Sequence, residues 1–261
     1  MKWKLQIIKW IVISIFIVGI VALAVLLTMY GSNHAQIENK INEFRCTVDK
    51  IQNKPTEDNE NTDTQKSYDR TTDGDSMFLG NVSSGIKNRV DVESLKRDSI
   101  AYNEELKQNQ NLKLVGNNYI YAALDLTNYG IHDNIYGYVS APSIDMDLPI
   151  YLGANDDTMS GGAGHLCYTS LPTGGADTNV VLAGHTGYIG RWLFDSVSSL
   201  SVGDEVSVTT YFGKLDYKVT RVLNRAPNDS DILFIEKGKD KLTLITCIDG
   251  GSARRVVVCE R

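Results

Sequence analysis

The chain has 261 residues, of which 42% are hydrophobic and 22% are charged, and its formal net charge is -6 at pH 7. A chain of this length can bury an ample core without help from disulfides or metals. Nucleic acid is excluded as a partner, because its binding depends on clustered Lys and Arg side chains that neutralise phosphates. We therefore expect one globular domain with appendages.

The N-terminal region differs sharply from the rest, because residues 10–29 form a run of 20 residues without a charge. As a helix this run spans roughly 30 Å, the thickness of the hydrocarbon core of a bilayer. Three lysines lie within residues 1–9, so the positive-inside rule places that tail in the cytoplasm and the remainder outside. A cleaved signal peptide is the alternative, but the run is longer than a usual signal-peptide core and no small-x-small cleavage site follows it. We therefore expect residues 10–30 to be a single-pass anchor in the cell membrane.

The chain beyond the anchor divides into three further segments that differ in composition and in the spacing of their apolar residues. Residues 31–84 are expected to form a stalk and a polar linker. Within them, apolar residues spaced by three and four predict a helix over 34–51, whereas 53–84 has too few large apolar side chains to offset the entropy of ordering. Residues 85–118 have the apolar spacing of a helical arm. Residues 119–261 are expected to be the main domain.

This main domain contains seven short β-rich runs bounded by Gly, Asn and Asp, with no long helical pattern between them. The runs are 135–141, 143–151, 179–184, 205–211, 214–223, 241–246 and 254–259. Such a pattern predicts an all-β barrel or sandwich with peripheral helices.

The four cysteines, Cys46, Cys167, Cys247 and Cys259, are far apart and form no CxxC pair. Neither a zinc site nor a dithiol redox centre is therefore expected, and a body of this size does not need disulfides. We expect free thiols, no metal and no cofactor.

Three residues could carry chemistry together. Cys247 ends a β-branched run and precedes a Gly-rich turn, His185 ends an apolar run between two glycines, and Arg255 opens the return strand after Cys247. Each alone has a simpler structural explanation, such as a buried core thiol for the cysteine. Together they would supply a nucleophile, a proton donor and acceptor, and a cation for an oxyanion.

Two segments identify a family that unites these residues. Residues 182–187 (LAGHTG) and 243–247 (TLITC), followed by an arginine that opens a hydrophobic strand, resemble the signature of the sortases. Residues 144–151 (IDMDLPIY) and 164–175 (GHLCYTSLPTGG) are similar to segments of class C, the pilus-assembling sortases of Gram-positive bacteria. The resemblance covers residues 134–261 and implies a closed eight-stranded β-barrel.

The resemblance also implies an activity, that of an extracellular cysteine transpeptidase. The thiol of Cys247 would attack an LPXTG-like sorting signal between Thr and Gly, His185 would protonate the departing amine, and Arg255 would stabilise the oxyanion. The acceptor amine would be a pilin lysine, or the cell-wall precursor if the enzyme anchors surface proteins. The partners would be LPXTG-bearing pilins or surface proteins. Substrate contacts are assigned to Thr169, Ser170, Leu171 and Thr246.

The resemblance also decides between two neighbouring arginines. Adjacent residues of a strand point to opposite faces, so only one of Arg254 and Arg255 can face the thiol. Arg255 is preferred because it directly precedes the valine run. His165 could be a second catalytic histidine, but its segment favours a role in ordering a loop.

The chain departs from class C at three points. None of its five prolines follows an aspartate, so a lid within 108–118 would lack the usual Asp-Pro-aromatic motif. The turn after Cys247 lacks the usual Thr-Pro, and no second apolar segment follows the last strand. A housekeeping-type sortase is therefore the nearest alternative.

Two other classes of protein remain open. A papain-like hydrolase would also use Cys and His, but its cysteine usually starts a helix and does not end a strand. A non-catalytic, membrane-tethered β-domain that only binds partners would need no role for Cys247.

Overall fold

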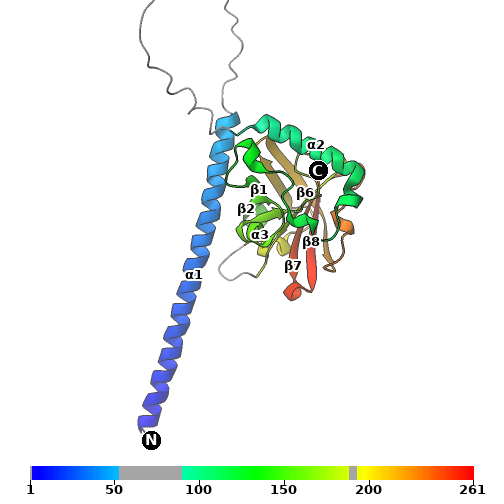
Figure 1. Cartoon of the computed structure of the whole chain (residues 1–261). Coiled ribbons are helices and arrows are strands. Elements are labelled where there is room, and N and C mark those ends of the chain that lie inside the picture. The colour runs from blue at the N-terminus through cyan, green and yellow to red at the C-terminus, as the bar shows by residue number, and fades with distance from the viewer. Residues whose placement is uncertain (1, 53–89, 188–192) are drawn as a thin grey trace, which may run out of the picture.

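A computed structural model describes residues 2–52, 90–187 and 193–261, and within these ranges eight strands close into a barrel in the order β1-β2-β3-β4-β7-β8-β6-β5 (Figure 1). The predicted linker, residues 53–84, lies outside the described ranges. The strands are β1 (Ile135–Ala141), β2 (Met146–Leu152), β3 (Ala163–His165), β4 (Thr178–Gly184), β5 (Glu205–Thr210), β6 (Gly213–Arg225), β7 (Asp240–Ile248) and β8 (Ala253–Glu260). The predicted closed eight-stranded barrel is confirmed.

Alternation along the strands explains why the barrel closes. In β7, Leu242 and Leu244 belong to the main core, while Ile245 packs in a separate cluster on the other face. In β8, Val257 and Cys259 point into the same main core. Successive side chains of a strand point to opposite faces, so one face of each strand fills the barrel.

Strand direction places several ends together. β1 pairs antiparallel with β2, β2 parallel with β3, β3 antiparallel with β4, and β4 parallel with β7. It follows that β1, β4 and β7 all finish at the same end of the barrel. We call this the site end.

The helix α1 (Lys2–Gln52) is one unbroken helix that combines two environments. Residues 10–29 are exposed along their whole length, and the helix is long and apolar enough to cross a membrane. Farther along, Ile37, Ile41, Phe44 and Val48 are buried against the barrel, at spacings of three and four that put them on one face. The helix predicted over 34–51 is therefore present, and it is docked on the barrel.

The helix α2 (Val92–Lys113) lies across the barrel and fixes the loop that follows β3. Asp91 caps its N-terminus, and Leu95 and Leu106 are fully buried. The buried amide of Asn103 donates to the Leu171 carbonyl at 2.8 Å and accepts from the Leu171 N–H at 2.8 Å. A polar side chain satisfied in this way is inexpensive to bury and fixes the loop in one conformation.

Candidate active site

Cys247 and His185 lie side by side at the site end. The parallel pairing of β4 with β7 extends as far as Gly184, which is opposite Thr246. His185 directly follows Gly184 in the chain, and Cys247 directly follows Thr246. Neighbouring strands are about 4.8 Å apart, so the two backbones are adjacent. The Thr186 hydroxyl donates to the Cys247 carbonyl at 2.8 Å and ties the two strand ends together. Both side chains line one pocket of about 310 Å³.

A glycine before the histidine is required by packing. A Cβ atom at Gly184 would lie 2.2 Å from Cδ2 of Phe194, so the aromatic ring occupies the space that any other residue would need. The Phe194 N–H also donates to the His185 carbonyl at 3.0 Å. The ring therefore supports the backbone that carries the imidazole.

A carboxylate faces the histidine from a short neighbouring helix. His185 Nε2 lies 3.6 Å from Asp156 Oδ1, and Asp156 is the first residue of α3 (Asp156–Gly161). The Asn155 side chain accepts from the Thr158 N–H, which fixes the start of this helix. Because the Asp156 side chain is 94% exposed, water screens the interaction strongly.

The pairing of β7 with β8 places Arg254 opposite the cysteine and Arg255 opposite the residue before it. Cys247 is directly opposite Arg254 in the β7–β8 ladder, and Arg255 is opposite Thr246. Residues directly opposite in an antiparallel pair share a face. Arg254 lines the pocket, whereas Arg255 shares the face of Val257 in the main core. Arg255 Nε is buried and finds no hydrogen-bond partner among the described residues, and the role expected for Arg255 stays a prediction.

The three residues of the loop after β3 that were expected to contact substrate do not line this pocket. Thr169, Ser170 and Leu171 are fully buried. The Thr169 hydroxyl donates to the Leu166 carbonyl at 2.7 Å, and the Ser170 hydroxyl accepts from the Asn179 N–H at 3.0 Å. These groups hold the loop against β4 and do not line the pocket. Of the four residues, only Thr246 borders the pocket, and its hydroxyl donates to the Gly184 carbonyl at 2.9 Å.

Several residues that line the pocket were not expected from the sequence. Arg225 is opposite Arg254 in the β6–β8 ladder and forms an ion pair with Asp229 at 3.2 Å. Tyr119, just after the segment 108–118 in which a lid was expected, forms another wall together with Met159. The only signal in the sequence was that Arg225 follows closely after the β-rich run 214–223, as Cys247 follows the run 241–246.

The other three thiols are poor candidates for the same chemistry. Burial raises the pKa of Cys259 to about 12, and burial also raises the pKa of Cys167. Cys46 is exposed on α1 and is not among the residues that line the pocket of Cys247. In the described part of the chain no group of three or more His, Cys, Asp or Glu could hold a metal ion.

The arrangement supports acyl transfer. A thiol at a strand end, an imidazole on the adjacent strand and a guanidinium opposite the thiol are the three groups that such a reaction needs. Arg254 donates to the Gly251 carbonyl at 2.9 Å and the Ala253 carbonyl at 3.2 Å, which are uncharged acceptors. Arg254 also lines the pocket.

A closed barrel that presents a cysteine and a histidine on two adjacent parallel strands is the architecture of a class of cysteine enzymes. The model of the Sortase domain matches residues 139–261. Sortase A of Streptococcus agalactiae is 27% identical over 128 residues, which are 48% of this chain and 51% of that protein. The chain thus spans about half of the length of the curated relatives it matches.

Solved structures give the same result. A crystal structure of Streptococcus agalactiae Sortase C1 is 30% identical, with a TM-score of 0.56, covering 64% of this chain and 88% of that one. Sortase A from Corynebacterium diphtheriae is 28% identical, with a TM-score of 0.58, covering 65% and 83%. The chain belongs to the sortase family, which confirms the resemblance seen in the sequence, and the neighbours named C1 support the likeness to class C.

Proposed function

We propose that this chain is a cysteine transpeptidase that cleaves an LPXTG-like sorting signal between Thr and Gly and transfers the acyl group to an amine. The observation that carries the proposal is the position of Cys247, His185 and Arg254 around one pocket. The proposal keeps the predicted roles of the first two residues and moves the role of the arginine from Arg255 to Arg254.

The reaction has two balanced halves. The Cys247 thiol gives its proton to His185, the thiolate sulfur attacks the threonine carbonyl carbon, and the Arg254 guanidinium stabilises the oxyanion that forms. As the C–N bond breaks, His185 gives a proton to the departing glycine amine and a thioester remains. An incoming amine then attacks the thioester carbon and passes a proton to His185, and the C–S bond breaks to release the Cys247 thiolate.

The acceptor amine distinguishes the two versions of this function. A pilin lysine, and therefore pilus assembly, is supported by likeness to structures named Sortase C1. The cell-wall precursor is supported by curated relatives named Sortase A. In both versions the apolar helix would anchor the enzyme in the cell membrane with its barrel outside the cell.

Mass spectrometry of the full chain in detergent, incubated with an LPXTG-type peptide, tests the proposal. We expect a peptide adduct on Cys247 that an added amine discharges. Cys247→Ala should give no adduct, and Cys46→Ala, which removes an exposed thiol elsewhere, should behave as the wild type does. His185→Ala should slow both formation and discharge of the adduct.

The opposite result is equally clear. If no peptide of the LPXTG series forms an adduct with the folded wild-type chain, the protein is not a transpeptidase of this kind, and the β-domain that only binds partners becomes the better explanation. An adduct that persists in Cys247→Ala would place the nucleophile elsewhere.

A further inference from the structure

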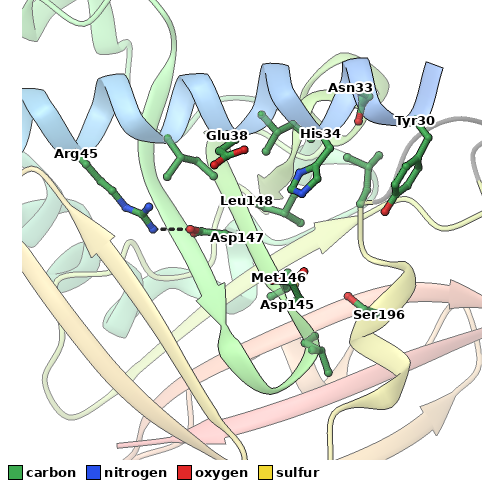
Figure 2. A pocket seen from close by; sticks show the side chains of 14 residues that line it. Tyr30, Asn33, His34, Glu38, Arg45, Asp145, Met146, Asp147, Leu148 and Ser196 are labelled. Atoms are coloured by element: carbon green, nitrogen blue, oxygen red, sulfur yellow. Dashed lines mark hydrogen bonds and ion pairs between the residues drawn. The ribbon is translucent and has the colours of Figure 1, made fainter. Parts of the chain in front are cut away.

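The docking of α1 on the barrel encloses a cavity that the proposed mechanism does not use. It has a volume of about 580 Å³ and lies between residues 30–45 of α1, residues 144–148 around the start of β2, and residues 193–196 (Figure 2). We call it the helix cavity. None of the described residues that line it also lines the pocket of Cys247. The chain therefore has a second concave site.

The helix cavity combines apolar walls with unpaired carboxylates. Glu38 lines it from α1, and Asp145 lines it from the turn before β2. Neither carboxylate forms an ion pair with any described residue, whereas Asp147 is paired with Arg45. The buried apolar residues in the lining are Ile37, Ile41, Met146, Leu148 and Leu193. This combination suits a lysine-like group, which buries an apolar stem and carries a compact cation at its end.

Two buried polar atoms in the helix cavity also lack partners. Ser196 is only 9% exposed, and its hydroxyl has no hydrogen-bond partner among the described residues. Figure 2 shows this hydroxyl turned into the cavity, toward Asp145 and Met146. Asp147 Oδ1 is likewise buried without a partner in the described part of the chain. Buried polar groups are nearly always hydrogen-bonded, and an ammonium has three donors to offer to such oxygens.

The helix cavity lies beside the backbone that carries the catalytic histidine. The Phe194 N–H donates to the His185 carbonyl at 3.0 Å, and the preceding residue, Leu193, lines the helix cavity. Asp195 accepts from the Gly187 N–H at 2.7 Å and from the Leu193 N–H at 3.2 Å, which holds this segment against the residues after His185. An extended polypeptide covers about 3.4 Å per residue, so a short segment can contact both sites.

Of the two substrates in the proposed reaction, the acceptor fits the helix cavity better. The sorting signal occupies the pocket of Cys247 when the thioester forms, and its reacting bond lies there. The acceptor enters after that step and must place an amine next to His185. A basic acceptor is attracted by carboxylates that have no partner of their own. The unpaired charges of Glu38 and Asp145 therefore favour a basic segment of the acceptor.

We propose that the helix cavity is a docking site for the acceptor polypeptide and binds a cationic side chain that lies a few residues from the reacting amine. This inference rests on the proposed transpeptidase function. It adds a requirement on the acceptor, which carries one cation that docks and a separate amine that attacks the thioester. The docking cation takes no part in bond making.

The test measures discharge of the Cys247 acyl-enzyme, formed by the full chain in nonionic detergent. Each acceptor peptide has one reacting lysine and a dimethyl-lysine at about 2, 4, 6 or 8 residues from it, a span of ~7 to ~28 Å. Dimethyl-lysine keeps its charge but cannot form a stable amide. Matched peptides carry norleucine there, which keeps only the apolar stem. At the best spacing we expect the charged peptide to discharge the thioester at least about fivefold faster below saturation.

Variants of the helix cavity test where the cation binds. Glu38→Gln combined with Asp145→Asn should reduce the advantage to about twofold or less, and asparagine tolerates the φ of 50° at this position. The loss should appear in the acceptor concentration for half-maximal discharge and not in the maximal rate. The matched control is Glu43→Gln, which removes an exposed carboxylate of α1 outside the cavity lining and should keep the full advantage.

Ser196→Ala gives a separate readout. It should lower the advantage of the charged peptide, because the docked cation loses an acceptor. It should also leave the free energy of unfolding of the free chain unchanged or higher, because the hydroxyl has no partner there among the described residues. A variant that is destabilised and keeps the full advantage would mean that Ser196 is structural and does not contact the ligand.

The outcomes separate the two proposals. If the wild type forms no acyl-enzyme, the transpeptidase function itself fails. If the acyl-enzyme forms and the charged and norleucine peptides discharge it equally at every spacing, the docking site is wrong and the function stands. Retention of the full advantage by the double variant would also overturn the docking site. If phosphatidylethanolamine added to the micelles abolishes the advantage, the cavity prefers a lipid headgroup and the assignment to the acceptor is overturned.

Discussion

At the scale of single residues, the proposed mechanism depends on which arginine near Cys247 has no carboxylate partner and can therefore interact with the substrate. Arg225, Arg254 and Cys247 lie on one face of three adjacent strands, because each is opposite the next in its ladder. The Arg225 guanidinium is neutralised by Asp229 at 3.2 Å. Arg254 donates to two backbone carbonyls, and no carboxylate among the described residues pairs with it. We therefore propose Arg254, which lines the pocket with Cys247, as the cation that stabilises the oxyanion.

Replacing each neighbouring arginine by lysine tests this assignment. Arg254→Lys should lower kcat by about 100-fold, because lysine lacks the planar fork of donors and one lost oxyanion donor costs 10²–10³ in rate. Arg255→Lys should keep kcat within about threefold, since its side chain shares the face that forms the core and its loss affects stability first. Steady-state kinetics with a fluorescent LPXTG-type peptide measure both. The reverse ranking would restore the role to Arg255.

At the scale of elements, β3 and the loop after it form a buried polar unit. His165 is fully buried, and its Nε2 lies 3.0 Å from the Ser170 carbonyl. A carbonyl oxygen only accepts, so Nε2 must carry the proton and donate. His165 Nδ1 is buried and has no hydrogen-bond partner among the described residues. A second proton on this ring would thus be buried without an acceptor, which is costly.

This burial predicts a pH-dependent stability. Burial lowers the pKa of His165 from its ordinary value of 6.5 to about 4, so the folded chain stays unprotonated there while the unfolded chain takes up a proton below pH 6.5. The free energy of unfolding should therefore be unaffected above pH 6.5, fall as the pH drops from 6.5, and level off below about 4. At about pH 5 the loss should be about 2 kcal/mol, from 1.36 kcal/mol per unit of pKa.

Urea unfolding of the full chain in detergent at neutral and mildly acidic pH measures this loss. His165→Gln keeps an N–H that can reach the Ser170 carbonyl but does not titrate, so its unfolding free energy should change less between the two conditions. His132→Gln removes an exposed histidine and should follow the wild type. Equal pH dependence in the wild type and His165→Gln would contradict the argument.

At the scale of the whole molecule, the sequence predicts the barrel better than its site. Period-2 alternation and β-branched runs locate most of the strands, because each strand has one face in the core. The facing of Arg254 could not be predicted, since it depends on the length of the turn at 249–252, where Asp249, Gly250 and Gly251 all have positive φ. Changing the length of that turn by one residue would exchange the faces of the two arginines.

The burial of the loop after β3 could not be predicted from the sequence either. Its Thr and Ser residues are polar and were expected to contact substrate, but they accept hydrogen bonds from β4, and the neighbouring Leu171 bonds to Asn103 on α2, which is distant in sequence. Docking of α1 is a third case, because an amphipathic pattern shows that a helix face is buried and does not say against what. The facing of Arg254, the burial of the loop after β3 and the docking of α1 all depend on tertiary structure that local sequence patterns do not show.

At the end of the barrel opposite the site end, the buried carboxylate of Asp240 links several segments by hydrogen bonds. Asp240, the first residue of β7, accepts from the Gly175 N–H at 2.9 Å and the Arg261 Nε at 2.9 Å on one oxygen, and from Thr178 and Tyr217 on the other. The Asp240 residue is only 8% exposed. Burial, together with the nearby Asp240 charge, raises the pKa of Tyr217, which keeps this phenol a donor. Four donors from three segments of the chain thus share one carboxylate.

Removing this acceptor should destabilise the whole barrel without altering the chemistry. Asp240→Ala leaves several buried donors unsatisfied and should cost about 3 kcal/mol, which lowers Tm by roughly 6–12 °C for a chain of this size. Asp240 is seven residues from Cys247 along an extended strand, a distance of about 23 Å, so kcat well below the melting range should be unchanged.

Thermal unfolding followed by circular dichroism, together with the peptide assay, measures both effects. The matched control is Asp216→Ala, which removes an exposed carboxylate paired with Lys214 at 2.7 Å and should shift stability by less than about 0.5 kcal/mol. A single transition at a lower temperature for Asp240→Ala would mean that the barrel unfolds cooperatively and that the hydrogen bonds to Asp240 stabilise the whole barrel. Unchanged Tm would mean that the ladder hydrogen bonds and the core hold that end closed without the carboxylate.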